Sequence, residues 1–214
     1  MSFLKKQVQS IPVKLPFGNQ RELPHPDDIP FVKLGIIVGH EEKAPGAKSD
    51  IGSEYEYNSE IAHKIVKYAE NMRNIKVVII KRDGIGIEGA YQAAEKANCD
   101  AVIELHFNEY TGTVGGSETL CSSDLTDVEF AHEVHAKMCE AFKRNGMSRG
   151  VKVLSRDARG AVNVHSFTKG VNCLVEPFFG DFKADVELAK LNKEEYAKAL
   201  VSGVLLWAAK NDFI

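Results

Sequence analysis

Two histidines and a glutamate occupy similar positions in three separate apolar segments of the sequence. His40, His106 and Glu176 each fall at or near the C-terminal end of a short apolar run that is typical of a buried strand. In an open α/β sheet, ligands bind at the carboxyl ends of the strands, where loops bring polar groups together. Imidazole nitrogens and a carboxylate oxygen are ligands that zinc favours. A lone histidine at a strand end is more often a hydrogen-bonded structural residue, so the coincidence of three residues carries this hypothesis.

The start of the helix that follows Ser53 offers a further carboxylate for such a site. Ser53 and Glu56 have the S-x-x-E spacing of a capping box, in which the Glu56 side chain turns back to the Ser53 backbone N–H. Glu54 instead shares a helical stripe with Ile61 and Ile65, the face expected to pack on the sheet. A buried carboxylate is costly unless it is paired, and a metal ion is one such partner. A favourable interaction with the helix dipole is the alternative explanation. Periodicity therefore favours Glu54 over Glu56, but it does not by itself identify zinc.

Strand-like apolar segments alternate along the chain with segments of helical periodicity. Strands are expected at residues 31–38, 76–80, 101–107 and 172–179, with an edge strand at 117–122. Helices are expected from Ser53, over residues 86–98, from a cap at Thr126 to about Arg144, and from Asn192 to about Lys210. This alternation predicts an α/β fold with a single twisted, mostly parallel sheet flanked by helices on both faces.

Length and composition indicate one globular domain with no obvious nucleic-acid or membrane partner. The 214 residues suit a single domain, and a net charge of −3 provides no basic field for nucleic acid. No apolar run approaches the roughly 20 residues that a membrane span needs. Residues 1–30 contain five of the seven prolines, which predicts an irregular N-terminal arm before a domain over residues 31–214.

The chain start and the cysteines indicate synthesis in the cytoplasm. The first 20 residues include lysines but no apolar segment of the kind found in a secretory signal peptide. The four cysteines are far apart and form no C-x-x-C pair. We therefore expect reduced, buried thiols and not a disulfide framework or a cysteine zinc site.

Seven short segments follow one another in an order that a known family shares. They are GHEEKAPGA (39–47), EYEYN (54–58), RD (82–83), LHFN (105–108), GSET (116–119), RGVK (149–152) and LVEPFF (174–179). In that order they resemble the PGHGGxDPGA, E-x-x-x-N, T-R-D, S-[IL]-H-x-N, G-x-E-[TV], N-R-G-V-K and L-V-E-x-G-F motifs of the zinc-dependent N-acetylmuramoyl-L-alanine amidases of the amidase-3 group. The resemblance covers about residues 33–210.

This resemblance implies a cofactor, a reaction and a role for each candidate residue. His40, Glu54 and His106 would hold Zn²⁺ with water at the open fourth position, and Glu176 would be the general base. A His₂Glu site with an open position polarises a carbonyl and lowers the pKa of its water to about 7. The substrate would be peptidoglycan, cut at the amide between the lactyl group of N-acetylmuramic acid and L-alanine of the stem peptide.

Three positions depart from the family pattern. Glu104 stands where the family usually has a small residue, and strand alternation places it on the same face as His106. It would be a second partner of that histidine, a further metal ligand, or a carboxylate bonded to neighbouring backbone. Pro177-Phe178 follows Val175-Glu176 where the family has a glycine after V-E-x, and residues 88–97 lack an arginine that the family often carries.

Several functional alternatives remain open on the sequence alone. Without a signal peptide, we expect an enzyme that reaches the cell wall as a phage endolysin or through a secretion machine. A zinc carboxypeptidase or poly-glutamate hydrolase of related fold is the enzymatic alternative. The non-enzymatic alternative is a cell-wall-binding module that has lost catalysis. The presence of Glu176 together with three candidate ligands argues against this alternative.

Overall fold

The computed structural model describes residues 29–143 and 147–214. The predicted arm, residues 1–30, lies outside the described residues except for its last two positions. The expected helix end near Arg144 also lies outside them. None of the helices in the described ranges has the length and apolar character that crossing a bilayer requires.

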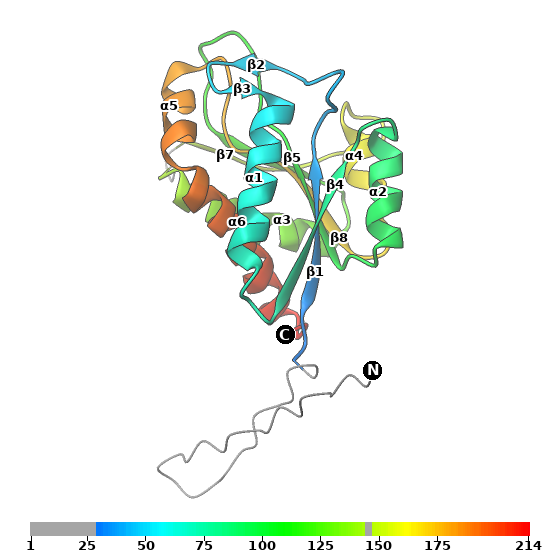
Figure 1. The fold of residues 1–214 in the computed structure, drawn as a ribbon. Coiled ribbons are helices and arrows are strands. Elements are labelled where there is room, and N and C mark those ends of the chain that lie inside the picture. The colour runs from blue at the N-terminus through cyan, green and yellow to red at the C-terminus, as the bar shows by residue number, and fades with distance from the viewer. Residues whose placement is uncertain (1–28, 144–146) are drawn as a thin grey trace, which may run out of the picture.

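A six-stranded sheet forms the centre of the molecule (Figure 1). Its strands are β1 (Val32–Val38), β4 (Ile75–Lys81), β5 (Ala101–Leu105), β6 (Ser117–Cys121), β7 (Ser148–Val153) and β8 (Val171–Glu176). They lie in the order β4-β1-β5-β8-β6-β7. Strands β4, β1, β5 and β8 are parallel, β6 is antiparallel to β8, and β7 is parallel to β6. The sheet is therefore mostly parallel, as the sequence predicts.

Mostly apolar sequence accompanies the strands that are covered on both faces. All five residues of β5 are buried, and β1 and β8 are buried at all but one position each. Helices pack on both faces of a parallel sheet, so its inner strands need apolar side chains on both sides. The outermost parallel strand, β4, has a mixed pattern of exposed and buried positions.

The expected edge strand is the one clear error in the predicted topology. Strand β6 lies between β8 and β7, and β7 forms that edge of the sheet. The β7 sequence SRGVKV is exposed or half-buried throughout, so it lacks the alternation that would have revealed a strand. A polar, charged edge strand of this kind also resists pairing with other chains.

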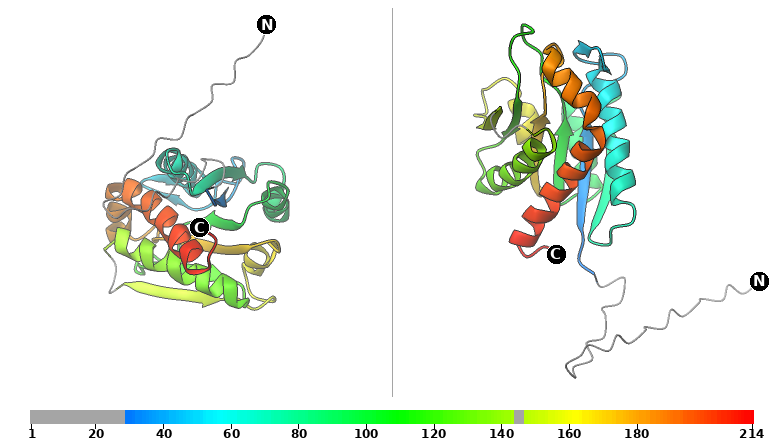
Figure 2. Two further views of the ribbon diagram at one scale, coloured as in Figure 1. Left: turned by 90° about the horizontal axis from the view of Figure 1, so that it is seen from below. Right: turned by 90° about the vertical axis from the view of Figure 1, so that its left-hand side faces the viewer.

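Helices cover both faces of the sheet, with the larger core on one side (Figure 2). On the larger side lie α1 (Glu54–Ala69), α3 (Leu125–Ala141), α5 (Lys183–Leu191) and α6 (Lys193–Lys210), and on the other α2 (Gly86–Lys96) and α4 (Ala161–His165). A short hairpin, β2 (Lys48–Ser49) and β3 (Gly52–Ser53), leads into α1. The four cysteines are free and buried, as expected.

One helix start, that of α3, differs from the sequence prediction. Helix α3 begins at Leu125, with Asp124 in the N-cap position and no side-chain capping bond, so Thr126 is already inside the helix. Helix α6 begins after Asn192 as expected, but the Asn192 amide donates to the carbonyl of Leu188 at the end of α5. Local capping motifs therefore predicted that these two helices exist, but not the hydrogen bonds made at their ends.

Candidate metal centre and active site

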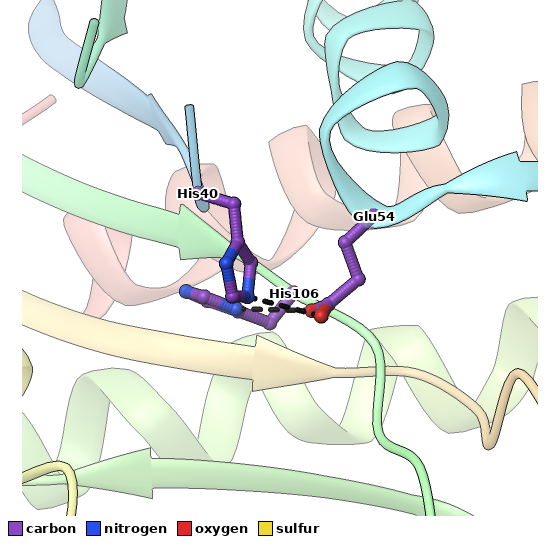
Figure 3. Close-up of side chains that lie close together, drawn as sticks. All are labelled: His40, Glu54 and His106. Atoms are coloured by element: carbon purple, nitrogen blue, oxygen red, sulfur yellow. Dashed lines mark hydrogen bonds and ion pairs between the residues drawn. The ribbon is translucent and has the colours of Figure 1, made fainter. Parts of the chain in front are cut away.

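The structure brings His40, Glu54 and His106 together at the carboxyl edge of the sheet (Figure 3). His40 follows β1, His106 follows β5 directly, and Glu54 is the first residue of α1. Because β1 and β5 are adjacent and parallel, the residues after their ends meet. His40 Nε2 lies 3.0 Å from Glu54 Oε2, and His106 Nδ1 lies 3.1 Å from Glu54 Oε1. One potential ligand atom from each residue lies within 4.8 Å of the others.

Two glycines make this close approach possible. A Cβ atom on Gly39 would lie 2.2 Å from the Leu105 carbonyl oxygen and 2.6 Å from His106 Nε2. A Cβ atom on Gly46 would lie 2.5 Å from Glu54 Oε2, and Gly46 also has a φ of +77°. Any larger residue would push the loop away from the two histidines. These glycines explain why the segment around His40 carries the G-H and P-G pairs.

The two glutamates in the first turn of α1, Glu54 and Glu56, have different hydrogen-bond partners. Ser53 caps the helix, and Glu56 Oε2 accepts the Ser53 backbone N–H at 2.8 Å, which completes the capping box. Glu54 is 5% exposed, and its carboxylate accepts the backbone N–H groups of Ala47 at 2.9 Å and Phe107 at 3.1 Å. Glu54 therefore faces the site, while the Glu56 carboxylate is occupied by capping.

The charges of the cluster suit a cation. Burial raises the pKa of Glu54, but hydrogen bonds from His106 and His40 outweigh it and hold that pKa well below its usual range. Burial lowers the pKa of His106, whereas hydrogen bonds to Glu104 and Glu54 raise it to about 10. A buried anion beside two imidazoles is the donor set of a His₂-carboxylate metal site, and the residues present fit a zinc ion.

A second group of side chains surrounds Glu176 at the end of β8. The Asn108 side-chain amide donates to Glu176 Oε2 at 2.7 Å and to Glu118 Oε1 at 2.9 Å. Arg149 Nε donates to Glu118 Oε2 at 2.7 Å. Burial, the hydrogen bond with Glu118 and the negative charge of Glu118 raise the pKa of Glu176 to about 8. Such a carboxyl group exchanges its proton close to neutral pH.

The sequence interpretation assigned no role to Asn108, Glu118 or Arg149. Each lies within a segment that resembles a family motif, so the signal was present. Their shared contact with the Glu176 group depends on the pairing of β8 with β6 and of β6 with β7. That strand order is a tertiary property.

A cleft of about 630 Å³ contains both groups of side chains. Its polar and charged lining residues are His40, Glu54, Arg82, His106, Asn108, Glu109, Glu118, Arg159, Asn163 and Glu176. The candidate ligands and Glu176 therefore face the same space, which is what a hydrolytic site with a proton-transferring carboxylate requires.

Comparisons with known proteins identify the family of the chain. The family model for N-acetylmuramoyl-L-alanine amidase matches residues 34–206. The chain therefore belongs to the N-acetylmuramoyl-L-alanine amidase family. A search of curated protein sequences found no match.

Solved structures of amidases share the fold. The N-acetylmuramoyl-L-alanine amidase from Clostridium difficile 630 has a TM-score of 0.73 and 21% identity, over 84% of this chain and 97% of that one. The catalytic domain of CwlV, from Bacillus (Paenibacillus) polymyxa var. colistinus, has a TM-score of 0.72 and 17% identity, over 86% and 100%. The catalytic domain of the CD27L endolysin, which targets Clostridia difficile, has a TM-score of 0.63 and 28% identity, over 82% and 97%.

Proposed function

We propose that this chain hydrolyses the amide between N-acetylmuramic acid and L-alanine in peptidoglycan, and that residues 31–214 form its catalytic domain. The observation that carries the proposal is the cluster of His40, Glu54 and His106 in the same cleft as Glu176. Membership of the amidase family supports the choice of bond.

In this proposal His40, Glu54 and His106 hold a zinc ion. Zinc in such a site supplies Lewis-acid polarisation of the scissile carbonyl and lowers the pKa of water to about 7. The chain's own contribution is to hold the three donor groups rigidly. The backbone N–H groups of Ala47 and Phe107 fix the Glu54 carboxylate, and the missing side chain of Gly39 leaves room for the His106 imidazole.

Glu176 is the proposed general base and acid. It takes a proton from the attacking water and returns it to the amine of L-alanine as the amide bond breaks. A pKa of about 8 suits this double role, because the carboxyl group then gains and loses a proton readily near neutral pH. Asn108 orients the carboxylate by donating to its Oε2 atom.

Similarity to the catalytic domain of an endolysin supports the proposal that the chain acts on the cell wall after phage-mediated release. Export through a secretion machine is the alternative route. Lysis of intact cells by the purified protein would show that it reaches the wall from outside. Lysis only of cells with permeabilised membranes would show that it needs a membrane lesion.

Mass spectrometry of digested, purified peptidoglycan tests the proposed reaction. We expect intact glycan strands and stem peptides with a new free amino terminus on L-alanine. Release of a C-terminal amino acid indicates the carboxypeptidase alternative, and cleavage of poly-glutamate in place of peptidoglycan indicates the poly-glutamate hydrolase. Wall binding without any product indicates a binding module. Each of these three outcomes contradicts the proposal.

A further inference from the structure

A fully buried carboxylate lies directly beneath the candidate metal site. Glu104 is in β5, between β1 and β8, and its exposure is 0%. A charge inside a sheet that is covered on both faces costs several kcal/mol unless hydrogen bonds and opposite charges compensate for it. The function proposed above gives Glu104 no role.

Four side chains surround the Glu104 carboxylate, and each is positioned to donate. Arg82 Nη1 lies 2.9 Å and His106 Nε2 lies 3.2 Å from Oε1. The Tyr91 hydroxyl lies 2.8 Å and Asn163 Nδ2 lies 2.9 Å from Oε2. Tyr91 belongs to α2 and Asn163 to α4, so both helices of the smaller face hold this carboxylate. The anion is thereby compensated and fixed in one orientation.

This arrangement determines which nitrogen of His106 is available for a metal. A carboxylate surrounded by donors accepts hydrogen bonds, so the His106 nitrogen that faces it, Nε2, carries the hydrogen. Nδ1 faces the candidate ligand Glu54 at 3.1 Å and donates a hydrogen to it in the metal-free chain. A zinc ion held by Glu54 and His106 would replace that hydrogen, whereas Nε2 keeps the hydrogen that it donates to Glu104. Gly39 lies against the Nε2 side of the ring, and the contacts of both ring nitrogens with Glu104 and Glu54 hold its orientation. The tautomer of the metal-bound ring therefore follows from a contact outside the metal cluster.

We propose that Glu104 is a positioning residue that fixes His106 as the Nε2–H tautomer and makes Nδ1 its metal-binding atom. The proposal rests on the metal centre of the proposed function. A carboxylate that accepts the second N–H of a ligating histidine raises the basicity of the ligand, and loss of such a partner typically weakens metal affinity by about 10–100-fold. Through Tyr91 and Asn163, metal affinity then also depends on α2 and α4.

The first test uses the unaltered chain. In protein with ¹⁵N-labelled histidine and one equivalent of zinc, long-range ¹H–¹⁵N spectra identify the protonated and the metal-bound nitrogen of each ring. We expect His106 to show a protonated Nε2 and a metal-bound Nδ1. Metal at Nε2, or zinc binding that leaves the His106 ring unaltered, overturns the proposal.

The second test removes the charge but keeps the shape. Glu104→Gln retains an oxygen toward His106, while the Tyr91 hydroxyl and the Asn163 amide can reorient toward the new NH₂ group. We expect zinc affinity, measured by competition with a chromophoric chelator, to fall about 10–100-fold. Excess zinc should restore the hydrolysis rate, which it would not do after purely structural damage.

Asp127→Asn is the matched control for loss of a buried carboxylate. Asp127 accepts from Ser122 and from the backbone of Asn172, at the opposite end of β8 from Glu176. We expect this variant to keep wild-type zinc affinity. Unchanged affinity in Glu104→Gln, or an equal loss in both variants, overturns the proposal; if Glu104→Gln fails to fold, the spectra of the unaltered chain decide alone.

The outcomes separate this inference from the proposed function. A wild-type chain that binds no zinc overturns both. A chain that binds zinc through His106 Nδ1 but releases no L-alanine-terminated peptides upholds the role of Glu104 and contradicts the amidase reaction.

Discussion

At the scale of single residues, the cleft holds two carboxyl groups whose pKa values are shifted in opposite directions by their surroundings. Hydrogen bonds from two histidines keep the pKa of Glu54 low despite its burial, so it stays an anion. Burial and the neighbouring Glu118 raise the pKa of Glu176 to about 8. When two carboxyl groups of one active site have well-separated pKa values, they can take different roles. In the proposed function these roles are metal binding for Glu54 and proton transfer for Glu176.

Replacement of Glu176 by glutamine tests the proton-transfer role. The amide keeps the shape and a hydrogen-bonding group but cannot take a proton from water. We expect zinc content to stay near one per chain while turnover of purified cell walls falls by about 10²–10⁴. Loss of zinc in Glu176→Gln would make this residue a ligand and reopen Glu54 as the base. Retained activity with zinc in place would move proton transfer to another group.

Replacement of Glu118 by glutamine tests what sets the pKa of Glu176. The Glu118 anion stabilises the protonated form of Glu176, so its removal should lower that pKa. The deprotonated, basic form then persists to lower pH, and the acid limb of the kcat/KM profile should shift toward lower pH. Arg149 and Asn108 contact Glu118 as well, so a zinc titration of Glu118→Gln serves as the control for an intact metal site. An acid limb that stays in place contradicts this coupling.

At the scale of elements, the site depends on how α1 begins against the end of β5. The Asn58 side-chain amide donates to the Leu105 carbonyl at 3.0 Å, which ties the second turn of α1 to the strand that precedes His106. Beneath this contact Tyr57, Phe107 and Phe178 pack closely, with the Phe107 and Phe178 ring centroids 4.9 Å apart. The aromatic core therefore fixes the distance between Glu54 and His106.

Two substitutions in the first turn of α1 should have opposite consequences. Glu54→Ala removes the buried carboxylate that contacts both histidines, so we expect a severe loss of zinc affinity. Glu56→Ala removes the two hydrogen bonds that Glu56 accepts from the Ser53 backbone N–H and hydroxyl, and it should leave zinc binding unchanged, with a small decrease in Tm. Zinc titration and thermal unfolding of the two variants provide the comparison. The reverse pattern would show that the metal site uses the other face of the helix.

At the scale of the whole molecule, the candidate metal site connects three elements that the chain contributes separately. His40, Glu54 and His106 follow β1, begin α1 and follow β5. A ligand that binds only the folded state raises the free energy of unfolding of the whole domain. The increase is about 2.7 kcal/mol at a free ligand concentration of 100 times Kd. Metal binding should therefore be visible in global stability as well as in activity.

Metal removal tests this connection. We expect about one zinc per chain in protein prepared without chelator, loss of activity and a lower Tm with a strong chelator, and recovery of both on addition of zinc. His40→Ala and His106→Ala should lack the metal and show no chelator-dependent change in Tm. Protein that contains no zinc and gains neither stability nor activity from added zinc would contradict the proposed mechanism.

The sequence by itself determined most of the strands and long helices and the candidate ligands, but not β7, α4 or α5. Mostly apolar runs identify β1, β5 and β8, because strands covered on both faces need apolar side chains on both. The capping box at Ser53 and the helical stripe through Glu54 depend only on residues close together in the chain. The choice of Glu54 over Glu56 as the candidate ligand therefore required no tertiary information. Spacing of three or four residues fixes which side chains share a helix face.

Tertiary structure decided which distant side chains meet. The polar strand β7 became an edge only through its pairing with β6, and the same pairing brought Arg149 to Glu118. Asn163 lies 59 residues from Glu104 in the chain, yet the two are in direct contact. Such contacts depend on strand order and on which face each helix covers, and no local periodicity encodes either. The sequence therefore predicted the candidate ligands and placed Glu104 on the face of His106, whereas the contacts of Asn163 with Glu104 and of Arg149 with Glu118 required the assembled sheet.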